Sequence, residues 1–199
     1  MEALINAGGK GTRMGACGIE KPMQVIGGKP VVQRVVEAIG ASAGISRVIV
    51  SVSEHTLETE RFLRDLGVET VRTSGEDFMD DLHEAFRCLN GKYVFISPSD
   101  MPLLTTAAVD RTIAAFDPER MESMIVLVDA DVVLGMGVTP SFTREINGKE
   151  WVLSGLSVMD RARTLAGEYL QESCLQTDWN EVAVNVNTPT ELALARLLF

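Results

Sequence analysis

Short apolar runs alternate with amphipathic segments along most of the chain. Strands are predicted where an apolar run is short and rich in β-branched residues, over 3–6, 47–52, 68–72, 93–97 and 123–129. Helices are predicted where apolar residues recur every three or four positions, over 30–39, 55–66, 76–89 and 105–116. Gly40 and Gly67 directly follow the first two helices, where glycine commonly ends a helix.

The periodicity weakens between residues 132 and 176, because several glycines and a proline interrupt it. We interpret 132–176 as an insertion of loops and short strands over one edge of the sheet. A last strand is predicted over 182–186, followed by a helix from Thr188 to Phe199. No linker divides the chain, so a single domain over 1–199 is expected.

This alternation predicts an α/β fold, a Rossmann-like, mostly parallel sheet flanked by helices on both faces. Ligands of such sheets bind beyond the carboxyl ends of the strands. The loops after Asn6, Arg72 and Ser97 should therefore lie along one edge, and we expect the functional site there.

Composition narrows the class of protein. Apolar residues make up 46% and charged residues 23% of the chain, as in soluble globular domains. The net charge of −10 argues against a nucleic-acid-binding surface, and no apolar run approaches the ~18 residues of a membrane span. The cysteines Cys17, Cys88 and Cys174 are scattered and odd in number, which argues against both a disulfide framework and a zinc site. Because the first strand begins at once, we expect no signal peptide and a cytoplasmic protein.

Residues 3–15, Ala-Leu-Ile-Asn-Ala-Gly-Gly-Lys-Gly-Thr-Arg-Met-Gly, contain the main candidate chemistry, with Glu-Lys-Pro following at 20–22. Glycines let backbone N–H groups approach a ligand closely. Lys10, Arg13 and Lys21 add positive charge, so the segment predicts a cradle for a polyphosphate. It lacks a Walker A sequence, and Met14 stands where a dinucleotide loop has its third glycine.

The same run resembles the signature of the nucleotidyltransferases that activate sugar phosphates, molybdopterin and cobinamide phosphate, roughly Leu-x-x-Gly-Gly-x-Gly-x-Arg-Met followed by Lys-Pro. The alternative is an ordinary glycine-rich turn. The resemblance implies the nucleotide-diphospho-sugar transferase-like fold. The nucleotide-binding residues that it implies in this loop are Ala7, Gly8, Gly9, Lys10, Gly11, Thr12, Arg13 and Lys21.

A candidate metal ligand follows the strand over 93–97, in Ser-Pro-Ser-Asp-Met-Pro. A carboxylate at the end of a central strand is well placed for Mg²⁺, which prefers oxygen ligands. The alternative for Asp100 is a solvated loop aspartate or a helix cap. Asp100 matches the nucleotide- and metal-binding aspartate of the resembling family, and Asn187 matches a residue that can supply its second metal ligand. Thr188 and Glu191 are explained locally as a capping box.

The segment Thr-Ser-Gly-Glu-Asp at 73–77 follows the third strand and opens a helix. Its simplest interpretation is a helix cap, with Thr73 or Ser74 as the capping residue. The functional interpretation is a clamp for the base, in which Ser74 and Gly75 act together with Ala7 and Gly8. Asp80 and Asp81 are weaker candidates.

These residues suit an in-line attack by a phosphate oxygen on the α-phosphorus of a nucleoside triphosphate, which needs positioning and charge neutralisation. Lys10 and Arg13, with Mg²⁺, would hold the β- and γ-phosphates and the leaving pyrophosphate. Lys21 would neutralise charge that develops in the transition state. The attacking phosphate is already anionic, so no general base is required.

Over its whole length the chain resembles the archaeal type of adenosylcobinamide-phosphate guanylyltransferase. This resemblance implies transfer of GMP from GTP to adenosylcobinamide phosphate, with release of pyrophosphate, in cobalamin biosynthesis. The alternatives are a molybdenum cofactor guanylyltransferase, which shares Asp-Met-Pro and Asn-x-Asn-Thr-Pro, a sugar-phosphate nucleotidyltransferase, and a catalytically inactive domain of the same fold. The apolar stretch 151–159 could face a corrinoid, form a core strand or form a homodimer contact.

Overall fold

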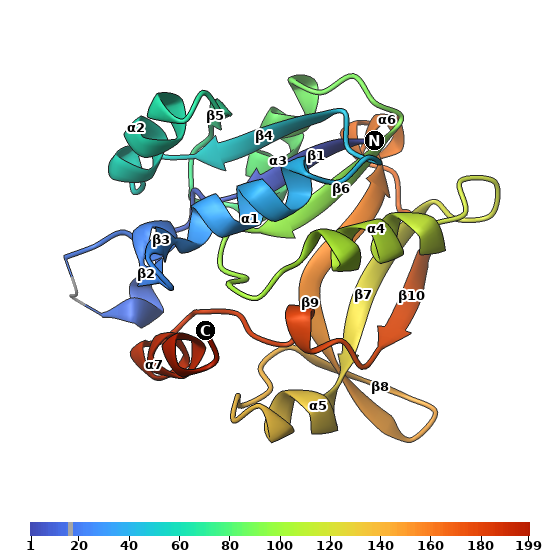
Figure 1. The fold of residues 1–199 in the computed structure, drawn as a ribbon. Helices are drawn as coiled ribbons and strands as arrows, with labels where there is room; N and C mark the ends of the chain where they lie inside the picture. Colours follow the sequence, from blue (N-terminus) through green and yellow to red (C-terminus); the bar gives the residue numbers. More distant parts are fainter. Residues whose placement is uncertain (16–17) are drawn as a thin grey trace.

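The computed structural model describes residues 1–15 and 18–199, and this part of the chain contains an eight-stranded sheet (Figure 1). Seven of its strands form a continuous path. In spatial order they are β10 (Glu172–Thr177), β7 (Ser123–Asp129), β9 (Lys149–Asp160), β6 (Tyr93–Pro98), β1 (Glu2–Asn6), β4 (Arg47–Val52) and β5 (Glu69–Arg72). β8 (Thr143–Ile146) pairs with β9 outside this path.

Parallel pairs dominate the sheet, as predicted. β1 lies between β4 and β6, and Leu4 is in register with Ile49 on one side and Ile96 on the other. β9 runs antiparallel to both of its neighbours in the path, β6 and β7. The carboxyl ends of β1, β4 and β6 therefore meet at one edge of the sheet.

Helices cover both faces of the sheet, which confirms the predicted fold class. α3 (Phe78–Arg87) packs Leu82 and Phe86 against Leu4 and Ile49, with α6 (Arg161–Leu165) beside it. On the opposite face, α1 (Val31–Gly40) and α4 (Thr106–Ala115) pack against the alternate strand residues, such as Ile5 (Figure 1). The other helices are α2 (Leu57–Asp65), α5 (Ala130–Gly135) and α7 (Pro189–Leu197). Shorter elements are β2 (Val25–Ile26), β3 (Lys29–Pro30) and the 3₁₀ turns Thr12–Met14, Lys21–Met23 and Asn180–Val182.

The description of 132–176 as loops and short strands was wrong for β9, which has twelve residues and lies within the main sheet. Its polar residues obscured it, because Ser154 and Ser157 occupy buried positions where an apolar residue is expected. The Ser154 hydroxyl satisfies its own burial by donating to the Val126 carbonyl at 2.9 Å. The stretch 151–159 is thus a core strand, and the acceptor-side role of 132–176 stays a prediction.

The strand predicted over 182–186 was also wrong. Val182 ends a 3₁₀ turn, and the residues after it form no strand, although Val184 and Val186 are buried. The Val186 amide instead donates to the main-chain carbonyl of Asp100 at 2.9 Å. The helix after it was predicted correctly, and the capping box between Thr188 and Glu191 is present.

The sequence predicted neither a membrane span nor a disulfide framework. Within residues 1–15 and 18–199, no helix combines the length and the apolar character needed to cross a bilayer. Cys88 and Cys174 are exposed free thiols. Cys17 lies outside the described residues.

Candidate active site

A cleft of about 530 Å³ lies at the carboxyl ends of β1 and β6, where the topology predicts a ligand site. Nearly every residue singled out from the sequence lines it. These are Ala7, Gly8, Gly9, Lys10, Gly11, Thr12, Arg13, Lys21, Gly75, Asp100 and Asn187. Ser74 and the weaker candidate Asp80 are not part of this lining, whereas Asp81, the other weaker candidate, is.

The glycine-rich loop is held by hydrogen bonds to β4 and to the residue that follows it. The Ala7 amide donates to the Ser51 carbonyl at 2.9 Å, and the Ser53 hydroxyl donates to the Gly8 carbonyl at 2.6 Å. Gly11 has a φ of +60°, which favours glycine, and it begins the 3₁₀ turn Thr12–Met14. Ser53 was not found from the sequence, because its partner lies 45 positions away.

Lys21 joins the other predicted segments. Its ammonium group forms an ion pair with Asp100 and lies 3.0 Å from Asn187 Oδ1, although these residues are 79 and 166 positions away in the sequence. Arg13 Nη2 also donates to Asn187 Oδ1, at 3.0 Å. The side chains of Lys21 and Asp100 are only 20% and 8% exposed, so their mutual attraction is weakly screened by water.

Asn185 fixes the orientation of the Asp100 carboxylate. Its Nδ2 donates to Asp100 Oδ1 at 2.9 Å and to the Ser154 carbonyl at 3.3 Å. Each carboxylate oxygen of Asp100 thus has its own donor, Asn185 on one side and Lys21 on the other. In the sequence, the capping box at Thr188 and Glu191 gives no reason for Asn185. In the structure, Asn185 positions Asp100.

The donor set fits a hard divalent cation. The Asp100 carboxylate and the Asn187 amide oxygen both contact the same ammonium nitrogen, so two oxygens from distant segments converge on one positive charge. Mg²⁺ in proteins takes one or two carboxylates together with other oxygen ligands and phosphate oxygens. Asp100 and Asn187 are the residues that would hold it, and this assignment stays a prediction.

The loop before α3 is fixed by the two aspartates near it. Asp77, rather than Thr73 or Ser74, caps the helix, since its Oδ1 accepts hydrogen bonds from the Met79 and Asp80 amides at 2.8 and 3.0 Å. Asp81 accepts hydrogen bonds from the Ser74 hydroxyl at 2.7 Å and from the Gly75 amide at 3.0 Å. The Ser74 hydroxyl therefore orders the loop.

Gly75 brings this loop against the glycine-rich loop. Its φ is +72°, and a Cβ added there would lie 2.7 Å from both the Gly8 carbonyl oxygen and the Ser53 hydroxyl oxygen. Only glycine permits so close an approach of the two backbones. The two predicted halves of a nucleotide site are consequently in direct contact.

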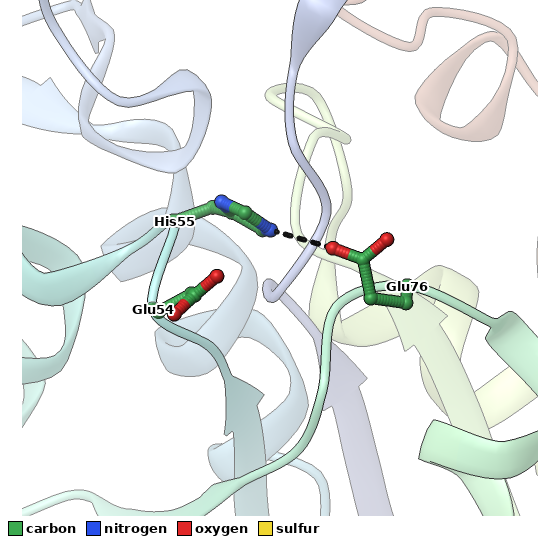
Figure 2. A group of neighbouring side chains, drawn as sticks. All are labelled: Glu54, His55 and Glu76. Carbon is green, nitrogen blue, oxygen red and sulfur yellow. Dashed lines mark hydrogen bonds and ion pairs between the residues drawn. The ribbon is translucent and has the colours of Figure 1, made fainter.

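The outer rim of the cleft carries an ionic cluster around Glu76. Lys10 Nζ lies 2.6 Å from Glu76 Oε2, and His55 Nε2 lies 3.3 Å from Glu76 Oε1 (Figure 2). Hydrogen bonds from Lys10 and then from His55 hold the pKa of Glu76 below its usual value. The helix predicted over 55–66 would include His55, but α2 begins at Leu57 and His55 lies in the turn before it.

Several residues that line the cleft or support its loops were missed in the sequence. Glu20 caps α2, because its carboxylate accepts hydrogen bonds from the Glu58 amide, the Thr59 amide and the Thr59 hydroxyl at 2.6–2.7 Å. This cap anchors the loop that carries Lys21. Phe78 lines the cleft while 59% exposed, and Gly155 and Ser157 of β9 form its opposite side.

A cationic glycine-rich loop thus lies beside an oriented carboxylate at the carboxyl edge of a mostly parallel sheet, an arrangement suited to binding a nucleoside triphosphate. The model of the MobA-like NTP transferase domain matches residues 3–182, and the chain belongs to this family.

Relatives span the full chain. It is 26% identical to the adenosylcobinamide-phosphate guanylyltransferase of Methanocaldococcus jannaschii, over 100% of this chain and 97% of that protein. It is 25% identical to a probable molybdenum cofactor guanylyltransferase of Thermococcus gammatolerans, over 96% and 97% of the two chains. A hypothetical transferase structure from Thermus thermophilus shares the fold with a TM-score of 0.73, 18% identity and coverage of 96% and 100%. The class of enzyme is therefore clear, while the relatives differ in their acceptors.

Proposed function

We propose that this protein transfers GMP from GTP to adenosylcobinamide phosphate, giving adenosylcobinamide-GDP and pyrophosphate in cobalamin biosynthesis. One observation supports nucleotidyl transfer above all. The ammonium group of Lys21 contacts both Asp100 and Asn187 beside the glycine-rich loop. The full-length similarity to the M. jannaschii enzyme supports the choice of GTP and of this acceptor.

The triphosphate would bind along the glycine-rich loop. Residues 8–11 line the cleft, and the cationic ends of the exposed residues Lys10 and Arg13 bind Glu76 and Asn187, which line it too. Such an arrangement places donors and positive charge against the β- and γ-phosphates. Mg²⁺ held by Asp100 and Asn187 would supply the remaining charge neutralisation.

The chemistry would be a single displacement at the α-phosphorus. An oxygen of the acceptor phosphate forms the new bond to this phosphorus, and the bond to the oxygen that bridges to the β-phosphate breaks, so that pyrophosphate leaves. Lys21 would place its positive charge on the oxygens around the α-phosphorus, where negative charge accumulates. The phosphate nucleophile carries no proton that must be removed at neutral pH.

The acceptor would enter from the side of β9. Gly155 and Ser157 line the cleft opposite the glycine-rich loop, and both belong to the segment 132–176. An acceptor bound there would present its phosphate to the α-phosphorus from the side away from the leaving pyrophosphate. This supports the acceptor-side role of the segment.

A second candidate function is molybdenum cofactor guanylylation. The T. gammatolerans relative matches almost as much of the chain, at nearly the same identity. The segments Ser-Asp-Met-Pro and Asn-Val-Asn-Thr-Pro, which carry Asp100 and Asn187, also resemble that family. Under this alternative the cleft would perform the same displacement with another phosphate.

A test compares acceptors in one assay. Pyrophosphate release from GTP and Mg²⁺ is followed with adenosylcobinamide phosphate or molybdopterin, and the product is identified by mass spectrometry. We expect release and a GDP-linked product with adenosylcobinamide phosphate alone. Asp100→Ala should abolish it, while the exposed control Asp131→Ala should not. A product formed only with molybdopterin would establish the alternative function.

A further inference from the structure

Three potential metal ligands lie together on the outer rim of the cleft, separate from Asp100 and Asn187. Glu54, His55 and Glu76 each offer one ligand atom, and these atoms all lie within 4.8 Å of one another. Figure 2 shows Glu54 and His55 on the turn that follows β4, with Glu76 facing them from the loop before α3. We propose that these three residues bind a divalent transition-metal ion.

The two segments that carry the ligands are fixed relative to each other. The turn is closed by hydrogen bonds from the Thr56 amide to the Ser53 carbonyl at 3.1 Å and from the His55 amide to the Ser53 hydroxyl at 3.1 Å. Ser53 is completely buried, and a Cβ added at Gly75, next to Glu76, would lie 2.7 Å from its hydroxyl oxygen. The two ligand-bearing segments thus lie close together around a buried residue, and little conformational entropy is lost when an ion bridges them.

The chemistry of the ligands selects the class of metal. One imidazole nitrogen with two carboxylates suits Zn²⁺, Co²⁺ or Mn²⁺, whereas Mg²⁺ prefers oxygen ligands and its own waters. The scattered cysteines argued against a zinc site, but the ligands of this cluster are one imidazole and two carboxylates, with no thiolate. The His55 side chain is 26% exposed and that of Glu76 57%, so an ion can reach them and retain water ligands.

The ion would also act on the glycine-rich loop. Glu76 uses Oε2 to pair with Lys10 and turns Oε1 toward His55. A cation on Oε1 withdraws negative charge from the carboxylate and weakens its pairing with Lys10. Lys10 then becomes available to the triphosphate. This consequence rests on the proposed role of Lys10, whereas the metal site itself does not.

The test uses the two histidines of the chain, His55 and His83. Imidazole NMR signals of the metal-free, full-length protein are followed while Zn²⁺ is added without nucleotide. We expect saturable shifts at His55, none at His83, and one ion per chain. His55→Gln should weaken binding at least about tenfold, as loss of a ligand does. His83→Gln and Asp100→Asn should bind as the unaltered protein does.

Three results would overturn the proposal. They are the absence of a saturable shift at His55, binding that His55→Gln leaves unchanged, and a Co²⁺ spectrum with thiolate-to-metal bands, which would assign the ion to cysteines. Circular dichroism and GTP binding of His55→Gln check that the variant is folded. The effect on Lys10 is measured separately, as tighter GTP binding in the presence of Zn²⁺ that His55→Gln abolishes. Equal GTP affinity with and without Zn²⁺ would overturn this effect and leave the site intact.

Discussion

The ammonium group of Lys21 forms an ion pair with the carboxylate of Asp100, and this contact joins the loop after β1 to the loop after β6. Both side chains are mostly buried, and the second Asp100 oxygen is bound by Asn185. The two charges to which the proposed mechanism assigns roles therefore balance each other in the structure. A buried charge that loses its partner is destabilising, so each residue keeps the other in place.

Lys21→Ala should lower the rate of nucleotidyl transfer at saturating GTP by about 10²–10³-fold, the range seen when a transition-state donor is removed. The substitution also leaves the Asp100 carboxylate without its cation. Lys29→Ala is the matched control, since Lys29 forms an exposed pair with Glu37 and neither residue lines the cleft. Equal losses of rate in both variants would contradict the role assigned to Lys21.

Asp100→Asn should raise the Mg²⁺ concentration needed for half-maximal rate by at least about tenfold, because a neutral amide is a weaker ligand for a hard cation. The amide is nearly the same size as the carboxylate, so the packing around Asn185 is largely preserved. The measurement is the initial rate of pyrophosphate release against Mg²⁺ concentration. A reduced rate with an unchanged Mg²⁺ dependence would show that Asp100 does not hold the metal.

Gly75→Ala should weaken GTP binding and lower the free energy of unfolding by more than about 1 kcal/mol. The new Cβ would clash with the Gly8 carbonyl at 2.7 Å, and alanine is strained at a φ of +72°. Gly135→Ala is the control, since no atom lies within 4 Å of its added Cβ. Calorimetric GTP titration and denaturant unfolding measure both effects. Unchanged GTP affinity in Gly75→Ala would mean that contact between the two loops is not needed for binding.

Acid should destabilise the fold through Glu2. Burial disfavours its charged form, but hydrogen bonds from the Gly91 amide, Arg47 and the Asn90 amide outweigh this and lower the pKa of the Glu2 carboxyl. The unfolded chain then binds the proton more readily than the folded protein. The stabilisation is complete above about pH 4.3, the ordinary value for Glu, and is lost as the pH falls further.

Glu2→Gln tests this pH dependence. Loss of the charge-assisted hydrogen bonds should cost about 1.5–3 kcal/mol at neutral pH. The difference in unfolding free energy between the variant and the unaltered protein should shrink as the pH falls below about 4.3. Denaturant unfolding at several pH values measures both quantities. A difference that stays constant across this range would contradict the assignment.

The parts of the fold that the sequence predicted are those that local patterns determine. The strand before the glycine-rich loop is a continuous apolar run, and α7 begins at a capping box whose members are three residues apart. A core strand over 151–159 was only one of the alternatives, because serines occupy buried positions of β9, where Ser154 satisfies its hydroxyl through a carbonyl of the neighbouring strand β7. The segment 182–186 was predicted to be a strand because of its alternate valines. These valines are buried, but the segment does not pair with a strand.

In the candidate site too, residues of a local motif were predicted, whereas residues whose role depends on distant partners were not. The glycine-rich loop, Lys21 and Asp100 were predicted because the chemistry lies in the motif itself. Ser53 and Glu20 were missed as positioning residues, since their roles depend on partners 45 and about 39 positions away. Burial and distant hydrogen bonds decide such roles, and neither is visible in a local pattern.

The central claim, transfer of the α-phosphorus to an acceptor phosphate, is tested most directly with two labels. GTP labelled at the α- or the γ-phosphorus is incubated with enzyme, Mg²⁺ and adenosylcobinamide phosphate in a single turnover. The account predicts that the α-label enters the cobinamide product and the γ-label enters pyrophosphate, at equal rates and without labelled protein. Transfer of the γ-label to the acceptor, or an α-labelled protein intermediate, would contradict it.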